Sequence, residues 1–372
     1  MWLHYILILY ILLIGTIFRE SNQGKAMKIL CLILTFGLFT VLASFRSDSV
    51  GNDTAEYLRI FNDISSTGGM SLYSWRYEKG YLFLNKILSL ITDQSQIILI
   101  ITSVMIMFGF ARFIFKYSNN IGLSVYLFFT LGYYGMSINT IRLSLAIVII
   151  LFSYDFLREK KLIKFIISVL LASLFHRAAL IFLIAWFIVK LKFSYKIIGI
   201  AMAGSIGLCV AFPAILQIVL RIFPTYQYYL GSSYLDGNIR LASVMNFLVG
   251  LSIMAFGAFT NYHKKATKLN GGNVNCVNDG ENMLLFLLVG ISITLISFNF
   301  SLLDRVSKFF FAFSIVYLPN AVKSISDKKE RVILSYIIIV LFFVYSTTIQ
   351  IMRPEWNVIY PYSFFWSNEA LN

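Results

Sequence analysis

Long apolar runs recur along all 372 residues of this chain and are separated by short polar stretches. Hydrophobic residues make up 59% of the sequence and charged residues only 13%, a balance that excludes a soluble domain. A helix built from such a run can cross the hydrocarbon core of a bilayer. The sequence therefore predicts an all-α fold, a polytopic membrane protein.

We predict about twelve transmembrane helices from the apolar runs. They lie at residues 2–18, 27–45, 95–115, 121–137, 140–157, 162–175, 178–190, 196–213, 241–260, 283–299, 306–323 and 332–351. The first run has no basic residue ahead of it and no small-residue cleavage site, so it is interpreted as a membrane helix rather than a removed signal. No internal repeat is visible, and residues 1–372 are predicted to form a single transmembrane domain.

Lysine and arginine are distributed unequally between the two predicted sides of the membrane. Lysine dominates one set of loops, whereas the other set carries nine arginines and three lysines. The positive-inside rule makes the lysine-rich side cytoplasmic, which places both termini and the inserts 46–94 and 214–240 outside, and the loop 261–282 inside. Orientation needs only positive charge, but bidentate capture of a phosphate needs a guanidinium group. The arginine-rich outer face is therefore predicted to handle phosphate.

Several other functions are not indicated by the composition. The formal net charge is +14, but most cationic residues lie in short loops where topology explains them, so we expect no nucleic acid partner. The three cysteines, Cys31, Cys209 and Cys276, have no metal-ligand spacing and no evident pairing. Neither a disulfide framework nor a zinc site is predicted.

The outer insert 46–94 is predicted to contain two short amphipathic periplasmic helices. Asp53 followed by Glu56 has the form of a capping box at the start of the first helix. Apolar residues at helical spacing follow on either side of Gly68-Gly69: Tyr57, Ile60, Phe61 and Ile64, then Tyr81, Leu84, Leu88 and Ile91. Such helices would form the rim or lid of a cavity.

The runs on either side of His176 are short. A helix from Leu162 to Phe175 rises only about 20 Å, less than the roughly 30 Å of hydrocarbon. The turn at His176 and Arg177 is therefore predicted to lie below the outer surface. Ionisable groups at that depth must face protein or a water-filled cavity, which predicts a recessed, outward-facing cavity.

Basic and acidic side chains on this outer side suit transfer of a group away from a lipid diphosphate. Cations would hold the diphosphate and stabilise the charge that develops as it leaves, and a carboxylate or histidine would take a proton from the attacking hydroxyl. Each candidate also has a structural alternative. These alternatives are Asp53 as a helix cap, Arg46 and Arg142 as membrane anchors, His176 as a structural histidine, and Arg305 neutralised by Asp304.

Five short motifs, in order along the chain, resemble those of a known family. They are Asn52-Asp53-Thr54 through Tyr57 and Phe61, Tyr77-Glu78-Lys79-Gly80-Tyr81, Ile141-Arg142 followed by Leu145-Ala146, Phe175-His176-Arg177-Ala178-Ala179-Leu180, and Tyr360-Pro361-Tyr362. Residues 46–362 resemble the EpsG-like family of bacterial polysaccharide polymerases, which includes Wzy-type O-antigen polymerases. The family often has proline where Lys79 stands and glutamine where Leu143 stands.

The resemblance implies a GT-C-like glycosyltransferase of the bacterial inner membrane that acts on its periplasmic face, in lipopolysaccharide biosynthesis. Such an enzyme moves a growing glycan from an undecaprenyl diphosphate carrier to the non-reducing-end hydroxyl of a carrier-linked repeat unit. Neither a cofactor nor a metal is expected. The expected partners are undecaprenyl diphosphate-linked oligosaccharides as donor and acceptor, membrane lipid, and a chain-length regulator of the Wzz type.

Eleven residues are predicted to form the site. Arg142, Arg177 and Arg305 would bind the donor diphosphate, and His176 is the first choice for general base, with Glu78 and Asp53 as second choices. The residues expected to hold the second carrier or the glycan are Arg46, Arg59, Arg76, Tyr360 and Tyr362.

Two rival functions remain open at this point. An O-antigen ligase would use nearly the same chemistry with lipid A core as acceptor. A flippase or transporter of the lipid-linked unit would need a polar path open to both sides. The predicted cytoplasmic halves of the spans are nearly free of charge, and their main exception, Asp155, is expected to pair with Arg158 or another residue of the adjacent loop.

Overall fold

The computed structural model describes residues 2–18, 24–222, 235, 239–262, 279–354 and 358–367. Within these ranges the regular structure is helical, and the one β-bridge is an isolated antiparallel pair between Arg46 and Phe364. The predicted all-α fold is therefore confirmed. The chain clusters into two compact units, Met1–Leu180 with Ile325–Asn372, and Ile181–Ser324, and each is described by itself.

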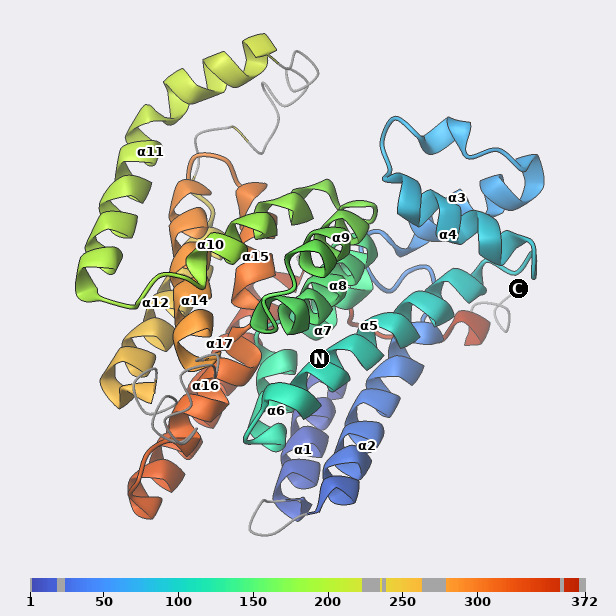
Figure 1. The fold of residues 1–372 in the computed structure, drawn as a ribbon. Coiled ribbons are helices and arrows are strands. Elements are labelled where there is room, and N and C mark those ends of the chain that lie inside the picture. Colours follow the sequence, from blue (N-terminus) through green and yellow to red (C-terminus); the bar gives the residue numbers. More distant parts are fainter. Residues whose placement is uncertain are drawn as a thin grey trace. The chain divides into compact units, whose positions relative to one another are not determined.

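Unit 1 contains most of the helices. Its elements are α1 (Trp2–Ile17), α2 (Lys25–Ser44), α3 (Thr54–Thr67), η1 (Ser71–Tyr73), α4 (Lys79–Ser89), α5 (Gln96–Tyr117), α6 (Ile121–Thr130), α7 (Tyr133–Asn139), α8 (Ile141–Arg158), α9 (Leu162–Ser173), α17 (Lys328–Met352) and η5 (Phe365–Ser367). The 3-10 helix η2 (Arg177–Ile184) begins in this unit. In its core α5 packs against α2 and α8, and α8 packs against α9 (Figure 1).

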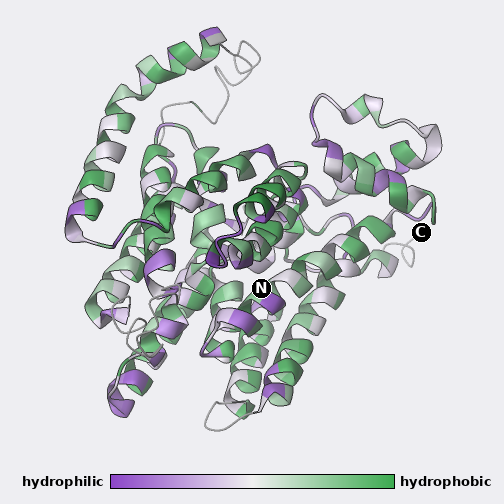
Figure 2. Cartoon of the chain, in the orientation of Figure 1, coloured by the Kyte–Doolittle hydropathy of each residue, from purple (hydrophilic) through white to green (hydrophobic). Residues whose placement is uncertain are grey.

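Six helices among the described residues are long and apolar enough to cross a membrane: α2, α5, α11, α12, α14 and α17. The bent pair of α6 and α7 makes a seventh span if it is counted as one. In Figure 2 hydrophobic residues run along most of α2 and α5, and hydrophilic residues gather at one end of α17. The chain is thus a membrane protein, but the predicted number of about twelve spans is not confirmed.

The remaining predicted spans differ from single long apolar helices for identifiable reasons. Residues 121–137 do not form one helix, because the chain bends by 50° between α6 and α7. Gly132 lies at this break with a φ of +82°, a left-handed conformation that glycine adopts without steric strain. Helices α1 and α9 are shorter than a full span, whereas α8 is long enough but carries Arg142, Asp155 and Arg158.

The outer insert folds as two helices, as predicted, although its details differ from the expectation. Helix α3 buries Tyr57, Ile60, Phe61 and Ile64, which confirms the first apolar stripe. Helix α4 buries Tyr81, Leu82, Asn85 and Leu88, whereas Ile91 lies beyond its end and is exposed. The predicted capping box is absent, because Asp53 occupies the N-cap position without a side-chain hydrogen bond to the helix.

A C-terminal segment, residues 358–367, lies along the chain that follows α2. Ser47 N donates to Ser363 O at 3.0 Å, Phe365 N donates to Phe45 O at 3.0 Å, and Gly51 N donates to Val358 O at 2.5 Å. The side chain of Tyr362 donates from its hydroxyl to Leu42 O at 2.8 Å. These bonds join the two sequence pieces of unit 1 beside the start of the outer insert.

Asp155 in α8 forms a charged contact within unit 1, at the end of the helix that was expected to be cytoplasmic. Its carboxylate accepts hydrogen bonds from Arg112 and from the Tyr117 hydroxyl, and Lys116 Nζ lies 2.9 Å from Oδ1. These partners come from α5 and its C-terminal end and were not named from the sequence, whereas the pairing with Arg158 stays a prediction. Residues distant in sequence therefore neutralise Asp155.

Unit 2 contains α10 (Ala185–Ile188), α11 (Tyr195–Ile222), α12 (Leu241–Thr260), α14 (Asp279–Ile296), α15 (Leu303–Phe311) and α16 (Ser314–Lys323). Helix α14 packs against α11, α12 and α15. Two boundaries differ from the prediction: α11 continues to Ile222 past the expected start of the insert 214–240, and the expected span 306–323 is divided into α15 and α16. Most of the insert 214–240 and of the loop 261–282 lies outside the described residues.

Candidate active site

The segment Tyr77–Gly80 lies against the turn that follows α9. Gly80 N donates to Leu174 O at 2.9 Å, and this bond attaches the N-terminal end of α4 to the chain that follows α9. A Cβ atom at Gly80 would lie 2.7 Å from Leu174 O and 2.8 Å from Leu174 Cβ, closer than real contacts allow. A residue with a side chain therefore cannot replace Gly80 without moving backbone, so glycine is needed for the two segments to meet.

Glu78 connects this segment to two of the predicted diphosphate-binding arginines. Its Oε2 atom accepts a hydrogen bond from Arg142 Nη1, and its Oε1 atom accepts one at 3.3 Å from the backbone N–H of Arg177. The side chains of Arg142 and Glu78 are 23% and 11% exposed, so the ion pair is mostly shielded from water and only weakly screened. Three segments distant in sequence thus meet at one carboxylate.

His176 and Arg177 occupy the turn between α9 and η2, as predicted. The backbone N–H of His176 donates to Ala172 O at 3.0 Å, and its carbonyl accepts from Ala179 N at 2.9 Å. The side chain of His176 is half-buried, and that of Arg177 is exposed. The first-choice base and a predicted diphosphate ligand therefore stand next to Glu78, while the role of each stays a prediction.

Tyr77 is a central residue of this cluster, and it was not among the site residues predicted from the sequence. Its side chain is 3% exposed, and the guanidinium carbons of Arg142 and Arg76 lie over its ring at 4.4 Å and 5.5 Å from the centroid. Its hydroxyl donates to Glu56 Oε1 at 3.2 Å. Burial raises the pKa of Tyr77 to about 12, so the phenol stays protonated and acts as a donor at neutral pH.

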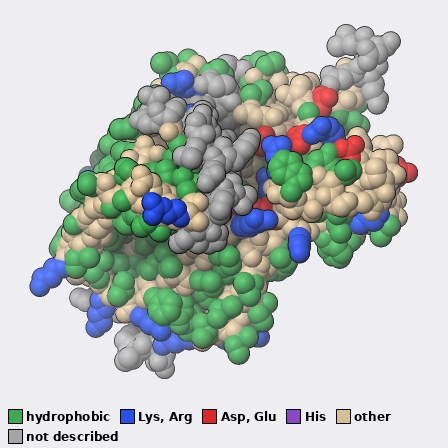
Figure 3. All heavy atoms as spheres, turned by 90° about the horizontal axis from the view of Figure 1, so that it is seen from above, with side chains coloured by type: hydrophobic (Ala, Val, Ile, Leu, Met, Phe, Trp, Pro, Cys, Tyr) green, Lys and Arg blue, Asp and Glu red, His purple; other side chains and the backbone are tan. Residues whose placement is uncertain are grey.

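Glu56 in α3 is the second missed residue, and it holds both arginines of the outer insert that were predicted to bind substrate. Its carboxylate accepts two hydrogen bonds from Arg59, at 3.0 and 2.6 Å, and lies 4.0 Å from Arg76 Nη1. Arg59 and Arg76 are 61% and 58% exposed, so both can still contact a ligand. Figure 3 shows acidic and basic side chains interspersed on the part of the surface that carries α3 and α4.

Arg46 is placed in the protein interior. Its side chain is 0% exposed and donates to the carbonyls of Ala43 and Ile138 and to Thr54 Oγ1, the last two at 3.2 Å. Burial lowers the pKa of Arg46 to about 10, which leaves it cationic at neutral pH. In this arrangement Arg46 connects α2, α3 and α7 and presents no surface to a substrate, so it is not retained as a substrate-binding residue.

Three other predicted residues of unit 1 lie on the first insert and the C-terminal segment. Asp53 is exposed at the start of α3. Tyr360 and Tyr362 belong to the C-terminal segment: the Tyr360 ring lies 5.9 Å from that of His4, and the Tyr362 hydroxyl donates to Leu42 O. The two tyrosines therefore contact α1 and α2, and their contribution to substrate binding stays a prediction.

Arg305 lies in unit 2, so its expected convergence with Arg142 and Arg177 stays a prediction. Its side chain is exposed. The structural alternative, neutralisation by Asp304, is not favoured by the contacts of that carboxylate: Asp304 accepts from Asn246 Nδ2 at 2.7 Å, and Lys308 donates to Asn246 Oδ1 at 3.1 Å. Helix α12 thus supplies the partner of Asp304 and leaves the Arg305 guanidinium at the surface.

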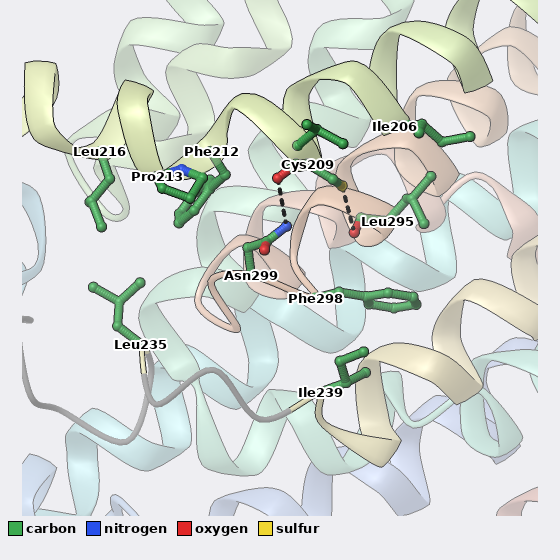
Figure 4. Close-up of a pocket in the computed structure, with 11 residues that line it drawn as sticks. Ile206, Cys209, Phe212, Pro213, Leu216, Leu235, Ile239, Leu295, Phe298 and Asn299 are labelled. Atoms are coloured by element: carbon green, nitrogen blue, oxygen red, sulfur yellow. Dashed lines mark hydrogen bonds between the residues drawn. The ribbon is translucent and has the colours of Figure 1, made fainter.

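Unit 2 also contains an apolar cavity of about 600 Å³ (Figure 4). Its lining consists of Ile206, Cys209, Val210, Phe212, Pro213, Leu216, Leu235, Ile239, Leu295, Phe298 and Asn299. Asn299 donates to Cys209 O at 3.5 Å, and the described residues of the lining include no carboxylate, imidazole or cation. These residues suit contact with hydrocarbon, whereas the groups suited to acid-base chemistry lie in the Glu78 cluster, which we take as the candidate active site.

The described residues contain no group of three or more His, Cys, Asp or Glu side chains placed to hold a metal ion. The Glu78 cluster contains the carboxylate of Glu78, the guanidinium group of Arg142 and the phenol of Tyr77. The imidazole of His176 is on the residue before Arg177, whose N–H bonds to Glu78. Their chemistry consists of binding an anion and moving a proton.

The structure defines a helical membrane protein in which charged and aromatic side chains of the insert 46–94, α8 and the turn after α9 form one cluster. A family model identifies it further: the EpsG family matches residues 28–364, almost the whole chain, and the protein belongs to that family. Membership indicates a polysaccharide polymerase-like, and hence glycosyltransferase-like, function. No curated protein and no solved structure matches the chain.

Proposed function

We propose that this protein is a Wzy-type polysaccharide polymerase of the bacterial inner membrane. It transfers a growing glycan from an undecaprenyl diphosphate carrier to the non-reducing-end hydroxyl of a carrier-linked repeat unit, on the periplasmic face. The bond from the anomeric carbon to the diphosphate breaks, a new glycosidic bond forms, and the carrier diphosphate leaves with the electron pair. The acceptor hydroxyl loses a proton in the same step.

The observation that carries this proposal is the convergence of Glu78, Arg142 and the His176-Arg177 turn from three separate segments. Each segment lies within the range that matches the EpsG family. A reaction that expels a diphosphate needs cations beside the leaving group and a base beside the nucleophile. The cluster contains a cation in direct contact with the Glu78 carboxylate, which is itself one candidate base, and His176 directly precedes the residue whose backbone N–H bonds to that carboxylate.

Within this site Arg142 and Arg177 are assigned to the donor diphosphate, with Arg305 of unit 2 as the third expected ligand. The exposed Arg59 and Arg76, oriented by Glu56, are assigned to the incoming carrier or glycan. Two groups are suited to take the acceptor proton, the His176 imidazole and the Glu78 carboxylate. Asp53, at the N-cap position of α3, is the third predicted base.

The test is incubation of purified protein with an undecaprenyl diphosphate-linked repeat unit, following released carrier diphosphate and product length together. A polymerase releases one diphosphate per bond formed and gives a ladder of chain lengths. Lipid A core is left out, so a ligase would give neither product. A transporter would move the lipid-linked unit without releasing diphosphate, and that result would overturn the proposal.

A further inference from the structure

The Arg142 guanidinium has hydrogen-bond donors that are not satisfied by the described residues. Among the described residues, its side-chain hydrogen-bond acceptor is Glu78 alone, through Nη1, and its buried Nε atom has no partner. The face of the group is covered by the Tyr77 ring at 4.4 Å. A buried N–H without an acceptor has lost its hydration without compensation, so a ligand that contacts both Nε and an Nη atom would be favoured over the present single contact.

Both carboxylate oxygens of Glu78 are engaged while the ion pair is intact. Oε2 accepts from Arg142 Nη1, and Oε1 accepts from the backbone N–H of Arg177. An acceptor hydroxyl can therefore donate to Oε2 only if Arg142 is withdrawn from it.

We propose that the donor diphosphate displaces Glu78 from Arg142, and that the released carboxylate is the group that accepts the acceptor proton. This inference rests on the proposed function. Two diphosphate oxygens take the Nε and Nη donors of Arg142, and Glu78 loses its cation. The acceptor oxygen then bonds to the anomeric carbon, the bond from that carbon to the diphosphate breaks, and the hydroxyl proton moves to Glu78. The leaving diphosphate keeps the electron pair, and Glu78 later returns the proton to water.

The surrounding contacts allow this exchange to stay local. Gly80 N remains bonded to Leu174 O, so the backbone of the first turn of α4 does not need to move. The Arg177 N–H holds one oxygen of Glu78 and serves as the point about which its carboxylate turns. Tyr77, tied to Glu56 through its hydroxyl, keeps the surface on which Arg142 lies.

If the donor diphosphate and Glu78 compete for Arg142, the affinity for diphosphate depends on Glu78. An ion pair with only a structural role would not have this effect. Removing the charge of Glu78 must strengthen diphosphate binding, because ligand and carboxylate exclude each other from the same cation. With Glu78→Gln we expect undecaprenyl diphosphate to bind roughly tenfold more tightly, within the usual range of coupling between two ligands. Glycan transfer should fall at least about a hundredfold, as expected for loss of a general base.

The experiment uses the full chain in lipid nanodiscs. Binding of undecaprenyl diphosphate without sugar is measured for wild type, Glu78→Gln and Asp93→Asn, and polymer ladders are measured in cells that carry each variant. Asp93→Asn is the matched control: it removes one negative charge from the same insert, and its amide oxygen can still accept from Ser65. Wild-type affinity is expected for this control.

Tighter binding with loss of polymer in Glu78→Gln supports the exchange. Unchanged or weaker binding overturns it, and tighter binding with a normal ladder overturns the assignment of the proton to Glu78. If Glu78→Gln does not reach the membrane, Glu78→Asp serves as the second variant, whose shorter side chain should also loosen the pair and tighten binding by a smaller factor. If wild type itself neither binds the carrier diphosphate nor makes polymer, the proposed function has failed instead.

Discussion

Replacement of Gly80 by alanine tests the contact on which the candidate active site is built. In a helix this substitution normally stabilises by about 1 kcal/mol, because alanine restricts the unfolded backbone and favours the helical conformation. At Gly80 the added Cβ would meet Leu174 O at 2.7 Å, Leu174 Cβ at 2.8 Å and Leu174 C at 3.0 Å. Two of these three atoms are backbone and cannot rotate away, so the sign of the effect should be reversed.

The size of the stability loss in Gly80→Ala is estimated from the separation of α4 and the turn after α9 that the new Cβ requires. An ordinary contact begins near 3.4 Å, so α4 and the turn after α9 would have to move apart by several tenths of an ångström. The hydrogen bond from Gly80 N to Leu174 O, now 2.9 Å, would be stretched past useful length, a loss of about 1 kcal/mol. Overpacking adds about 1–3 kcal/mol, so after the helical gain we expect a net loss of about 1–3 kcal/mol.

The assay compares Gly80→Ala with Gly37→Ala, a control in α2 of the same unit where a Cβ meets nothing within 4 Å. Thermal unfolding of purified protein should show Gly80→Ala lower by on the order of 5 °C and Gly37→Ala unchanged or slightly higher. Polymer formation should fall with Gly80→Ala alone, because the Glu78 carboxylate is carried with the displaced turn. Equal melting temperatures and normal polymer in both variants would refute the close approach.

Three further substitutions test individual side chains of unit 1. His176→Ala separates the two candidate bases: with Glu78 as the proton acceptor, polymer ladders and carrier-diphosphate binding should stay close to wild type, whereas loss of polymer with intact protein level and diphosphate binding would assign the proton to the imidazole. Arg142→Lys should lower transfer by roughly tenfold or more, because lysine loses the stacking on Tyr77 and the bidentate fork, and undiminished transfer rates would make Arg142 an anchor. Arg46→Met should lower stability by about 1–3 kcal/mol in a thermal melt, since it leaves the Thr54 hydroxyl and two buried carbonyls without this donor; an unchanged melt would contradict the interior role.

Helix positions were predictable from sequence because hydropathy is a local property of the chain. The predicted run 241–260 coincides with α12, and the runs 95–115 and 332–351 differ from α5 and α17 by one to four residues at each end. The break at Gly132 was missed, since a left-handed residue inside an apolar run has no hydropathy signal. The segments on either side of His176 were correctly predicted to be short, and their shortness accounts for two of the twelve predicted crossings that are not found as full spans.

The sequence predicted which residues belong to the candidate site better than it predicted which of them contact one another. Glu78, Arg142, His176 and Arg177 were chosen for charge and outward placement, and the structure brings them to one turn. That Glu78 would pair with Arg142 depends on the docking of α4, which no local pattern encodes. Glu56 had a usable signal, its spacing of three residues from Arg59 on a helix, but it was assigned to a capping box instead.

The C-terminal segment has a consequence for the order in which this protein is assembled. The sequence of unit 2, Ile181–Ser324, lies between the two pieces of unit 1. During synthesis the chain around Ser47 and Gly51 emerges early, yet its hydrogen-bonding partners, Ser363 and Val358, are made only after all of unit 2. Unit 1 therefore stays incomplete until the C-terminal segment has been synthesised. A chain that ends before residue 358 lacks these hydrogen bonds at the start of the outer insert, although all of the described membrane helices have already been made.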